Sequence, residues 1–275
     1  MKKSLITMQP YFVFGTDQFI QYRCFRNGIS HLYAFRADPE AEEGNLIIPD
    51  GCINILFGYD ETGMDAKVYG TVRSPQVFVP DKKEYFGIRL YQDEFISLMN
   101  CSPEEIAGST ADLDSIPMIR SYRQQLSMAG NFTQRVQILR SFMENELPCS
   151  PDHKEELLQQ IKSSILESGG RESVTEIEAQ FHYSARYINR IFQEKMALSV
   201  KEYSEIVHLQ RILFRIKEHS YTTLTDLAVE EDYYDQAHFT RKFREYTHMT
   251  PLEYGRKMLT TCFKEKIVEI KTGYR

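Results

Sequence analysis

The chain has 275 residues, of which 42% are hydrophobic, and a formal net charge of −6 at pH 7. This length is typical of two compact domains, and the apolar fraction is sufficient for ordinary cores, so disorder is not indicated. No run approaches the roughly 20 apolar residues that a membrane-spanning helix needs, so no membrane-spanning helix and no membrane partner are expected. We therefore expect a soluble, cytoplasmic protein.

The cysteines do not form a recognisable framework. There are five of them, at Cys24, Cys52, Cys101, Cys149 and Cys262. Their number is odd and none shows CxxC spacing, so neither a disulfide scaffold nor a zinc knuckle is predicted. Reduced thiols are expected.

The acidic charge is concentrated in the first part of the chain. Residues 171–275 contain 17 Lys and Arg against 16 Asp and Glu, whereas residues 1–170 contain 16 against 23. Contact with phosphate requires local positive potential. A nucleic-acid partner would therefore have to be held by a few well-placed cations rather than by a general basic surface.

Residues 11–91 have the pattern of strands and turns. Short runs rich in Val, Ile, Phe and Tyr are separated by Gly, Pro and Asp, which is typical of a β-rich domain. We expect strands at 18–26, 30–36, 44–48, 52–58, 66–72, 75–80 and 84–91. The pattern predicts a β-sandwich or a small barrel.

After residue 102 the apolar spacing becomes helical. Apolar residues recur at steps of three and four in two groups: Val136, Leu139, Phe142, Met143 and Leu147, then Leu157, Leu158, Ile161, Ile165 and Leu166. This predicts two amphipathic helices, which either pack onto their own domain or form a dimerisation surface. Gly169 and Gly170 follow and are interpreted as a hinge.

The last hundred residues contain an internal repeat, whose two copies are about fifty residues apart. The first copy runs Ser173, Val174, Glu176, Ile177, Phe181, Tyr183, Ser184, Ile188, Arg190, Phe192, Leu198, Ser199, Tyr203. The second runs Thr223, Leu224, Asp226, Leu227, Glu231, Tyr233, Tyr234, Phe239, Arg241, Phe243, Met249, Thr250, Tyr254. Each copy has the signals of a helix-turn-helix, and two such units in one chain predict contact with two adjacent grooves of DNA.

Capping residues set the helix starts within each copy. Ser173 with Glu176 is predicted to form a capping box, and Thr223 with Asp226 is a shorter version of it. Ser184 is expected to cap the second helix of the first copy.

The second helix of each copy presents side chains suited to reading bases. Its outward residues are Arg186, Asn189, Arg190 and Gln193 in the first copy and Gln236, His238, Thr240, Arg241 and Arg244 in the second. Arg binds guanine O6 and N7 with two donors, and Asn or Gln matches adenine N6 and N7. A single exposed Arg is more often merely solvated. Arg190 and Arg241, however, occupy the same place in both copies, two residues before Phe192 and Phe243.

Residues 173–258 resemble the C-terminal domain of the AraC/XylS family of bacterial transcription regulators. The second copy carries the most specific stretch: Leu227-Ala228, Tyr233, Asp235-Gln236, His238-Phe239, Arg241, Phe243, Thr250-Pro251 and Tyr254. The segment 203–217 corresponds to the long helix that joins the two units. The resemblance places His182 and Asp232 where the family has turn glycines, and both residue types tolerate a left-handed backbone better than most. Tyr234 stands where the family has a capping Ser, so Asp235 is expected to cap the second helix of the second copy. The resemblance implies that Arg186, Asn189, Arg190, Gln236, Ala237, His238 and Arg241 face DNA bases, and we add Arg244 to the predicted DNA-binding set.

The resemblance also implies a domain organisation and a set of binding partners. We expect an α+β protein with a β-rich regulatory or effector-binding domain at 1–112, linking helices at 113–169 and an all-α double helix-turn-helix domain at 170–275. The expected partner is double-stranded DNA, with RNA polymerase, a small-molecule effector and a second copy of the chain as further candidates. No cofactor is expected.

The stretch 47–57 and the stretch 86–90 resemble the front domain of one branch of these regulators. Arg89 and the aromatic residues of this domain line an effector pocket in one interpretation. In the other, the aromatic residues belong to the core and Arg89 is a surface or paired residue. No ligand is implied by this match.

Two alternative functions, a metal enzyme and a protein-interaction module, require different residues. A cupin-like metal enzyme requires clustered His and carboxylate ligands, but His31 is the only histidine of the β-rich part and no HxH, HExxH or GxSxG motif occurs. The second alternative is a protein-interaction module with degenerate helix-turn-helix units. Four carboxylates (Glu230, Glu231, Asp232 and Asp235) favour it, because carboxylates near phosphate are repulsive.

Overall fold

The computed structural model describes residues 7–26, 29–37, 45–91, 106, 110–112, 117–146 and 153–270. The strands are β1 (Phe19–Arg26), β2 (Ile29–Arg36), β3 (Asn45–Ile47), β4 (Cys52–Asp60), β5 (Gly63–Tyr69), β6 (Gln76–Phe78), β7 (Glu84–Tyr91), β8 (Thr110–Asp112) and β9 (Ile267–Glu269). The helices are α1 (Pro10–Phe14), α4 (Pro117–Met128), α5 (Phe132–Glu146), α6 (His153–Ser168), α7 (Val174–Phe181), α8 (Ala185–Met196), α9 (Val200–Lys217), α10 (Leu224–Glu230), α11 (Gln236–Thr247), α12 (Pro251–Thr260) and α13 (Phe263–Lys266).

The N-terminal part is built on one large sheet in the order β8-β5-β4-β7-β2-β1-β9, with β3 and β6 paired separately. The seven strands predicted between residues 18 and 91 are all present, with bounds shifted by up to three residues. Strands β8 and β9 were not predicted. Each has three residues, which is too short to show an alternating pattern.

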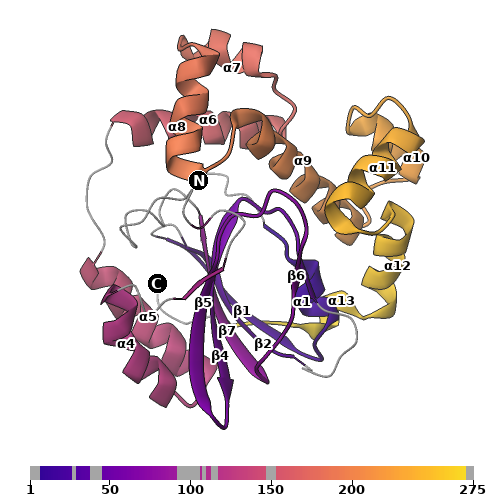
Figure 1. Ribbon diagram of the computed structural model, residues 1–275. Coiled ribbons are helices and arrows are strands. Elements are labelled where there is room, and N and C mark those ends of the chain that lie inside the picture. Colours follow the sequence, from indigo (N-terminus) through magenta and orange to yellow (C-terminus); the bar gives the residue numbers. More distant parts are fainter. Residues whose placement is uncertain are drawn as a thin grey trace.

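Alternation along the strands sends side chains to two cores. Leu32 and Phe86 belong to the core under α4 and α5, together with Leu126 and Val136 of those helices. Tyr33 belongs to the core on the opposite face. Figure 1 shows α4 and α5 on one side of the sheet and α12 and α13 on the other.

The amphipathic helices predicted between 113 and 169 pack within the chain. Val136 and Leu139 of α5 contribute to the core of the sheet, whereas Leu157 and Ile161 of α6 join a core with α8 and α9. Helix α5 thus packs on the sheet and α6 on the first helix-turn-helix unit, while a dimerisation surface stays a prediction. The predicted positions at 142, 143 and 147 lie outside the residues whose side chains are described.

Helix α9 connects the two helix-turn-helix units. It has 18 residues and is therefore roughly 27 Å long. Its first half packs on α6 and α8 through Tyr203 and Val207, and its second half joins a core with α11 and α12 through Ile212 and Ile216. Figure 1 shows α9 running from the α6–α8 group to the α10–α12 group.

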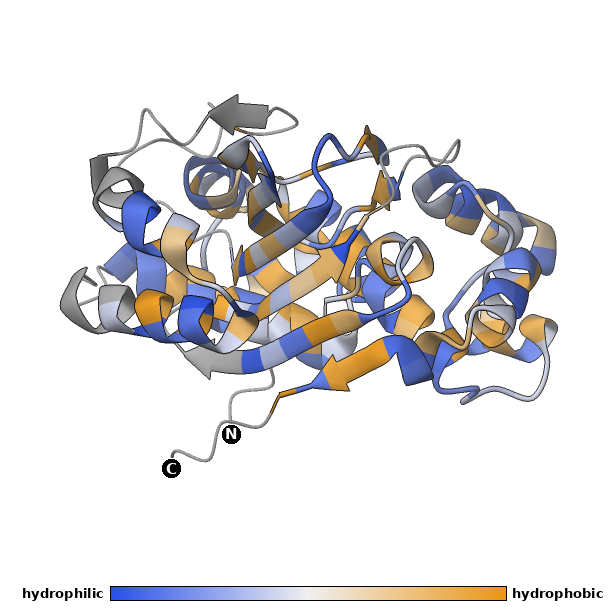
Figure 2. Ribbon diagram, turned by 90° about the horizontal axis from the view of Figure 1, so that it is seen from below, coloured by the Kyte–Doolittle hydropathy of each residue, from blue (hydrophilic) through white to orange (hydrophobic). Residues whose placement is uncertain are grey.

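The second helix-turn-helix unit and the large sheet share one hydrophobic core. Phe14 contacts Tyr254 and Phe263 with ring centroids 6.0 and 5.5 Å apart, and β9 pairs in parallel with β1. Figure 2 shows apolar residues concentrated along the central strands and in β9. The C-terminal unit is thus packed against the N-terminal domain rather than tethered to it.

The glycine pair after α6 is a packed turn, which corrects its interpretation as a hinge. Both residues have positive φ, +69° at Gly169 and +80° at Gly170, and their amides donate to Leu166 and Ile165 carbonyls at 3.2 and 2.8 Å. A Cβ at Gly170 would lie 2.2 Å from the carbonyl oxygen of Ser204 on α9. Glycine is required here because the backbone of α9 leaves no room for a side chain.

Gly170→Ala is expected to lower the free energy of unfolding by at least about 2 kcal/mol, because it adds a left-handed backbone penalty to a steric clash. Urea unfolding followed by circular dichroism measures the change. Gly130→Ala is the matched control: its nearest contact would be 3.8 Å away, so we expect a change within about 0.5 kcal/mol. Equal stability of the two variants would contradict this account.

Candidate nucleic-acid interface

The first helix-turn-helix unit is fixed by the predicted caps. The Ser173 side chain accepts from the Glu176 amide, and the Glu176 carboxylate accepts from the Ser173 amide at 2.8 Å. His182 ends α7 in a left-handed conformation with φ 58°. Ser184 then caps α8 by accepting from the Tyr187 amide at 3.3 Å. These residues set the angle at which α8 leaves the turn.

The second unit repeats this construction. Thr223 caps α10 by accepting from the Asp226 amide at 3.0 Å, and Asp232 takes the left-handed turn position with φ 59°. Asp235 caps α11 by accepting from the His238 amide at 2.6 Å. We refer to α8 and α11, the second helices of the two units, as the recognition helices.

The exposed face of α8 carries two arginines one turn apart. Arg186 and Arg190 are exposed, and the guanidinium of Arg190 lies 5.1 Å from the centre of the Tyr187 ring. Glu194 stands one turn further, where its carboxylate pairs with Lys154 at 2.9 Å. Within the described part of the chain, no carboxylate forms an ion pair with Arg190, so its donors face solvent.

Asn189 does not belong to this exposed set. Its side chain is half-buried, its amide nitrogen donates to the Ala185 carbonyl at 3.0 Å, and its oxygen accepts from the Val200 amide at 3.0 Å. The side chain therefore links α8 to the first turn of α9. This is a structural role, and we leave Asn189 out of the surface proposed below.

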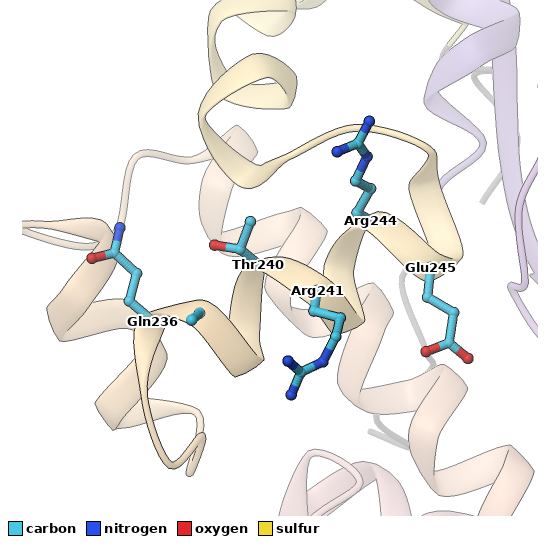
Figure 3. Close-up of a pocket in the computed structure, with 6 residues that line it drawn as sticks. Gln236, Thr240, Arg241, Arg244 and Glu245 are labelled. Carbon is cyan, nitrogen blue, oxygen red and sulfur yellow. The ribbon is translucent and has the colours of Figure 1, made fainter.

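Two stripes of side chains run along the exposed face of α11. One consists of Gln236, Thr240 and Arg244, and the other of Ala237, Arg241 and Glu245; together they line a shallow hollow (Figure 3). Arg241 and Arg244 are exposed. The carboxylate of Glu245 pairs with Lys242 at 3.1 Å, so Arg241 has no ion-pair partner among the described residues.

The stripe that contains Arg241 matches the stripe on α8. With the offset of 51 residues, Arg190 corresponds to Arg241 and Glu194 to Glu245. In both helices a separate lysine neutralises the glutamate. Each arginine is therefore available for a partner outside the chain.

The remaining predicted residues of α11 take different positions. Gln236 is exposed and accepts from the Thr225 hydroxyl at 3.0 Å, which fixes its amide at the start of the helix. His238 is half-buried, with its ring 5.5 Å from that of Tyr233. Ala237 is exposed and leaves the helix surface open beside Arg241.

The acidic residues before α11 are largely occupied within the protein. Glu230 pairs with Arg215, Asp232 lies 3.4 Å from Arg171, and Asp235 forms the cap described above. Glu231 is fully buried and pairs with Arg211 and Arg215 at 3.1 and 2.8 Å. The carboxylates that favoured a protein-interaction module therefore mostly meet cations of their own domain.

Glu231 also accepts from His208 at 3.2 Å. Burial raises the pKa of Glu231, but the hydrogen bonds from His208, Arg215 and Arg211 outweigh this effect and hold its pKa at about 2. A carboxylate whose pKa is lowered by folding stabilises the protein above its ordinary pKa, and this contribution is lost as the pH falls towards the folded value.

Glu231→Gln is expected to lower the free energy of unfolding by about 3 kcal/mol at pH 7, because it removes the charge that holds α9 to α10. The difference in free energy of unfolding between the variant and the unchanged protein should shrink to about half or less at pH 3. This pH lies between the ordinary pKa of a glutamate and the folded pKa of about 2. Urea unfolding at both pH values measures the difference. Glu245→Gln, on the exposed face of α11, is the control. If the stability difference between Glu231→Gln and the unchanged protein were independent of pH, the lowered pKa of Glu231 would be contradicted.

Arg89 is a paired core residue, which decides between the two interpretations of this side chain. It is 1% exposed, its Nε donates to Asn54 at 2.9 Å, and the same atom lies 3.4 Å from the Asp50 carboxylate. The nearby aromatic residues Tyr33 and Phe35 stack in the core with centroids 6.3 Å apart.

Within the described residues, no three His, Cys, Asp or Glu side chains come together as a metal site. No helix in this same part of the chain is both long enough and apolar enough to cross a membrane.

The sequence analysis did not predict that the glutamate one turn after each arginine is paired with a lysine. Glu194 and Glu245 occupy equivalent positions in the duplicated unit, so the repeat itself could have found them. Their lysine partners could not be found in this way, since Lys154 comes from α6 and Lys242 from α11.

One family model matches the C-terminal part of the chain. Residues 177–257 match the family model of a helix-turn-helix domain. Among solved structures, an apo variant of ToxT from Vibrio cholerae has 9% identity, covers 84% of this chain and 98% of its own, and gives a TM-score of 0.44. Another ToxT structure from Vibrio cholerae has 10% identity, covers 82% and 96%, and gives a TM-score of 0.41. No curated protein matches the chain. Residues 177–257 are therefore a helix-turn-helix domain.

Proposed function

We propose that the protein is a sequence-specific DNA-binding regulator of transcription. Its two recognition helices would enter successive major grooves, about 34 Å apart, on one side of the duplex. The observation that carries this proposal is the placement of Arg190 and Arg241 at equivalent positions of two helix-turn-helix units, both exposed and both without a carboxylate partner among the described residues.

The proposed reading surface has a defined chemistry. Arg186 and Arg190 on α8, and Gln236, Arg241 and Arg244 on α11, supply donors for base edges and phosphates. Ala237 supplies an apolar contact of the kind that suits a thymine methyl group. His238 contributes less, because it is partly buried and its ring lies against that of Tyr233. All of these residues lie in the proposed DNA-binding domain at 170–275, which leaves residues 1–112 and 113–169 for regulation.

The acidic net charge of the chain is consistent with DNA binding that depends on a few cations. The chain is acidic overall, so non-specific attraction to phosphate is weak. Specific binding must then come from the two arginine-bearing stripes. Such a protein should discriminate strongly between sequences, and its affinity should fall as salt rises.

Selection of genomic fragments by the purified protein, followed by titration of the selected duplex at rising salt, tests this proposal. The expected result is a common sequence with two half-sites and a loss of affinity of about tenfold or more between 50 and 200 mM salt. Absence of any duplex binding at 50 mM salt would overturn the proposal and favour the protein-interaction module.

A further inference from the structure

The N-terminal domain contacts the end of the recognition helix α11. Tyr11, on the short helix α1, donates its phenol hydroxyl to the carbonyl oxygen of Thr247, the last residue of α11. Both residues are buried. The last carbonyls of a helix have no partner inside the helix, so an external donor at this point fixes the position of the helix end.

The N-terminal domain also contacts the end of the other recognition helix. Arg73, between β5 and β6, donates to the carbonyl oxygen of Ala197, the residue that follows α8. Its Nε lies 3.5 Å from the carboxylate of Glu202, which belongs to the capping box of α9. One arginine thus links the end of α8, the start of α9 and the sheet, and its positive charge suits a helix C-terminus.

These two contacts are nearly equivalent in the duplicated unit. With the offset of 51 residues, Ala197 corresponds to His248, the neighbour of Thr247. Two unrelated side chains of the N-terminal domain therefore bind carbonyls at the ends of the two recognition helices, at positions one residue apart in the repeat. Figure 1 shows the sheet lying below the group of α8 and beside the group of α11.

A third attachment holds the helix between the two units. Gln210, at 0% exposure, donates to the Pro49 carbonyl at 2.8 Å and accepts from the Met8 amide at 2.6 Å. Gln9 in turn bonds both the amide and the carbonyl of Ile48, at 2.9 and 2.6 Å. The segment at residues 8–9 is thus bonded on one side to the loop before β4 and on the other to α9.

From these contacts we infer that the N-terminal domain is a frame that sets the orientation of the two recognition helices relative to each other, with Tyr11 and Arg73 as positioning residues. The inference rests on the proposed function. Besides helix α9, an ion pair between Arg171 and Asp232 at 3.4 Å joins the two units. The attachments to the N-terminal domain hold this connection at both ends and in the middle. Neither side chain belongs to the proposed reading surface.

The physical consequence concerns the spacing of half-sites. Two base pairs inserted between them displace one half-site by about 7 Å and rotate it by roughly 70° around the duplex, given 3.4 Å and 10–10.5 base pairs per turn. A rigidly framed pair of helices cannot follow this displacement. A pair connected only by α9 and the Arg171–Asp232 ion pair follows it in part.

The test compares the selected duplex with one that carries two inserted base pairs, using the full chain and the double variant Arg73→Ala/Tyr11→Phe. Both changes are mild, since Arg73 is half-exposed and phenylalanine keeps the ring of Tyr11 in the core. The matched control is Lys83→Ala/Tyr59→Phe. It removes an exposed ion pair to Glu61 and a phenol contact at 3.4 Å to the Leu126 carbonyl, neither of which involves α8, α9 or α11.

We expect the unchanged protein and the control to lose at least about tenfold in affinity on insertion, and the double variant about threefold or less, a difference comparable to one mismatched base pair. Affinity for a duplex with a single half-site should be the same for all three proteins, which a general loss of structure would not give. An insertion penalty that the double variant shares with the control would overturn the inference and leave the proposed function intact. Failure of the unchanged protein to bind any duplex would overturn the proposed function itself.

Discussion

Replacing Arg190 or Arg241 by alanine is expected to weaken binding to the selected duplex by about 5- to 150-fold each, which corresponds to about 1–3 kcal/mol for a bidentate base contact. The two side chains lie on different helices and share no partner, so their effects should multiply in the double variant. Fluorescence anisotropy at constant salt measures the dissociation constants. Loss of base preference at the affected position should accompany the loss of affinity.

The matched control for these variants is Arg36→Ala. Arg36 is also exposed, but it lies at the end of β2 in the N-terminal domain. We expect its affinity to remain within about twofold of the unchanged protein, since a distant surface charge acts only through screened electrostatics. Equal losses in Arg36→Ala and Arg190→Ala would show that net charge rather than position controls binding, contrary to the assignment of α8.

Asp50→Asn is expected to lower the free energy of unfolding by about 3–5 kcal/mol, because it leaves the guanidinium of Arg89 buried without a counter-charge. Both side chains are 1% exposed. The amide keeps the shape of the carboxylate, and its oxygen still accepts from the Cys52 amide, a bond of 3.0 Å in the unchanged protein. The loss therefore reports on charge and not on packing.

Two further variants sharpen this test in urea unfolding. Glu61→Gln breaks the exposed pair with Lys83, at 2.9 Å, and should cost less than about 1 kcal/mol. Asp50→Asn combined with Arg89→Met removes both buried charges and should be more stable than the sum of the single changes predicts. A change of less than about 1 kcal/mol for Asp50→Asn alone would contradict the importance of this pair.

The sequence predicted those parts of the molecule that depend on local signals. The caps at Ser173, Ser184 and Thr223 were predicted because a helix start requires a side-chain acceptor within three residues. The strands between residues 18 and 91 were found because alternation and turn residues are local as well. The duplication extended this success to the placement of Arg190 and Arg241, since a repeat predicts position without any knowledge of packing.

The features that were missed depend on contacts between distant residues. Gly170 was interpreted as a hinge because nothing near it in sequence shows that the backbone of α9 passes within contact distance. Asn189 was predicted to face DNA, yet its oxygen binds the Val200 amide, eleven residues away. The pairing of β9 with β1 joins segments about 250 residues apart. Such contacts are decided by the whole fold and leave no periodic signal.

The ion-pair partners of the acidic residues before α11 also could not be predicted from the local sequence. In the sequence Glu230 and Glu231 are neighbouring negative charges that oppose phosphate binding. In the structure Arg215 reaches both of them from α9. The sign of a local charge run therefore says little about the potential of the surface until its partners are known.

The most direct measurement of the central claim is a base-resolved footprint of the protein on its selected duplex. We predict two protected major-groove segments one helical turn apart, with Arg190→Ala losing protection in one segment only and Arg241→Ala in the other. Protection of a single segment by the unchanged protein, or two segments that neither variant alters, would contradict the account.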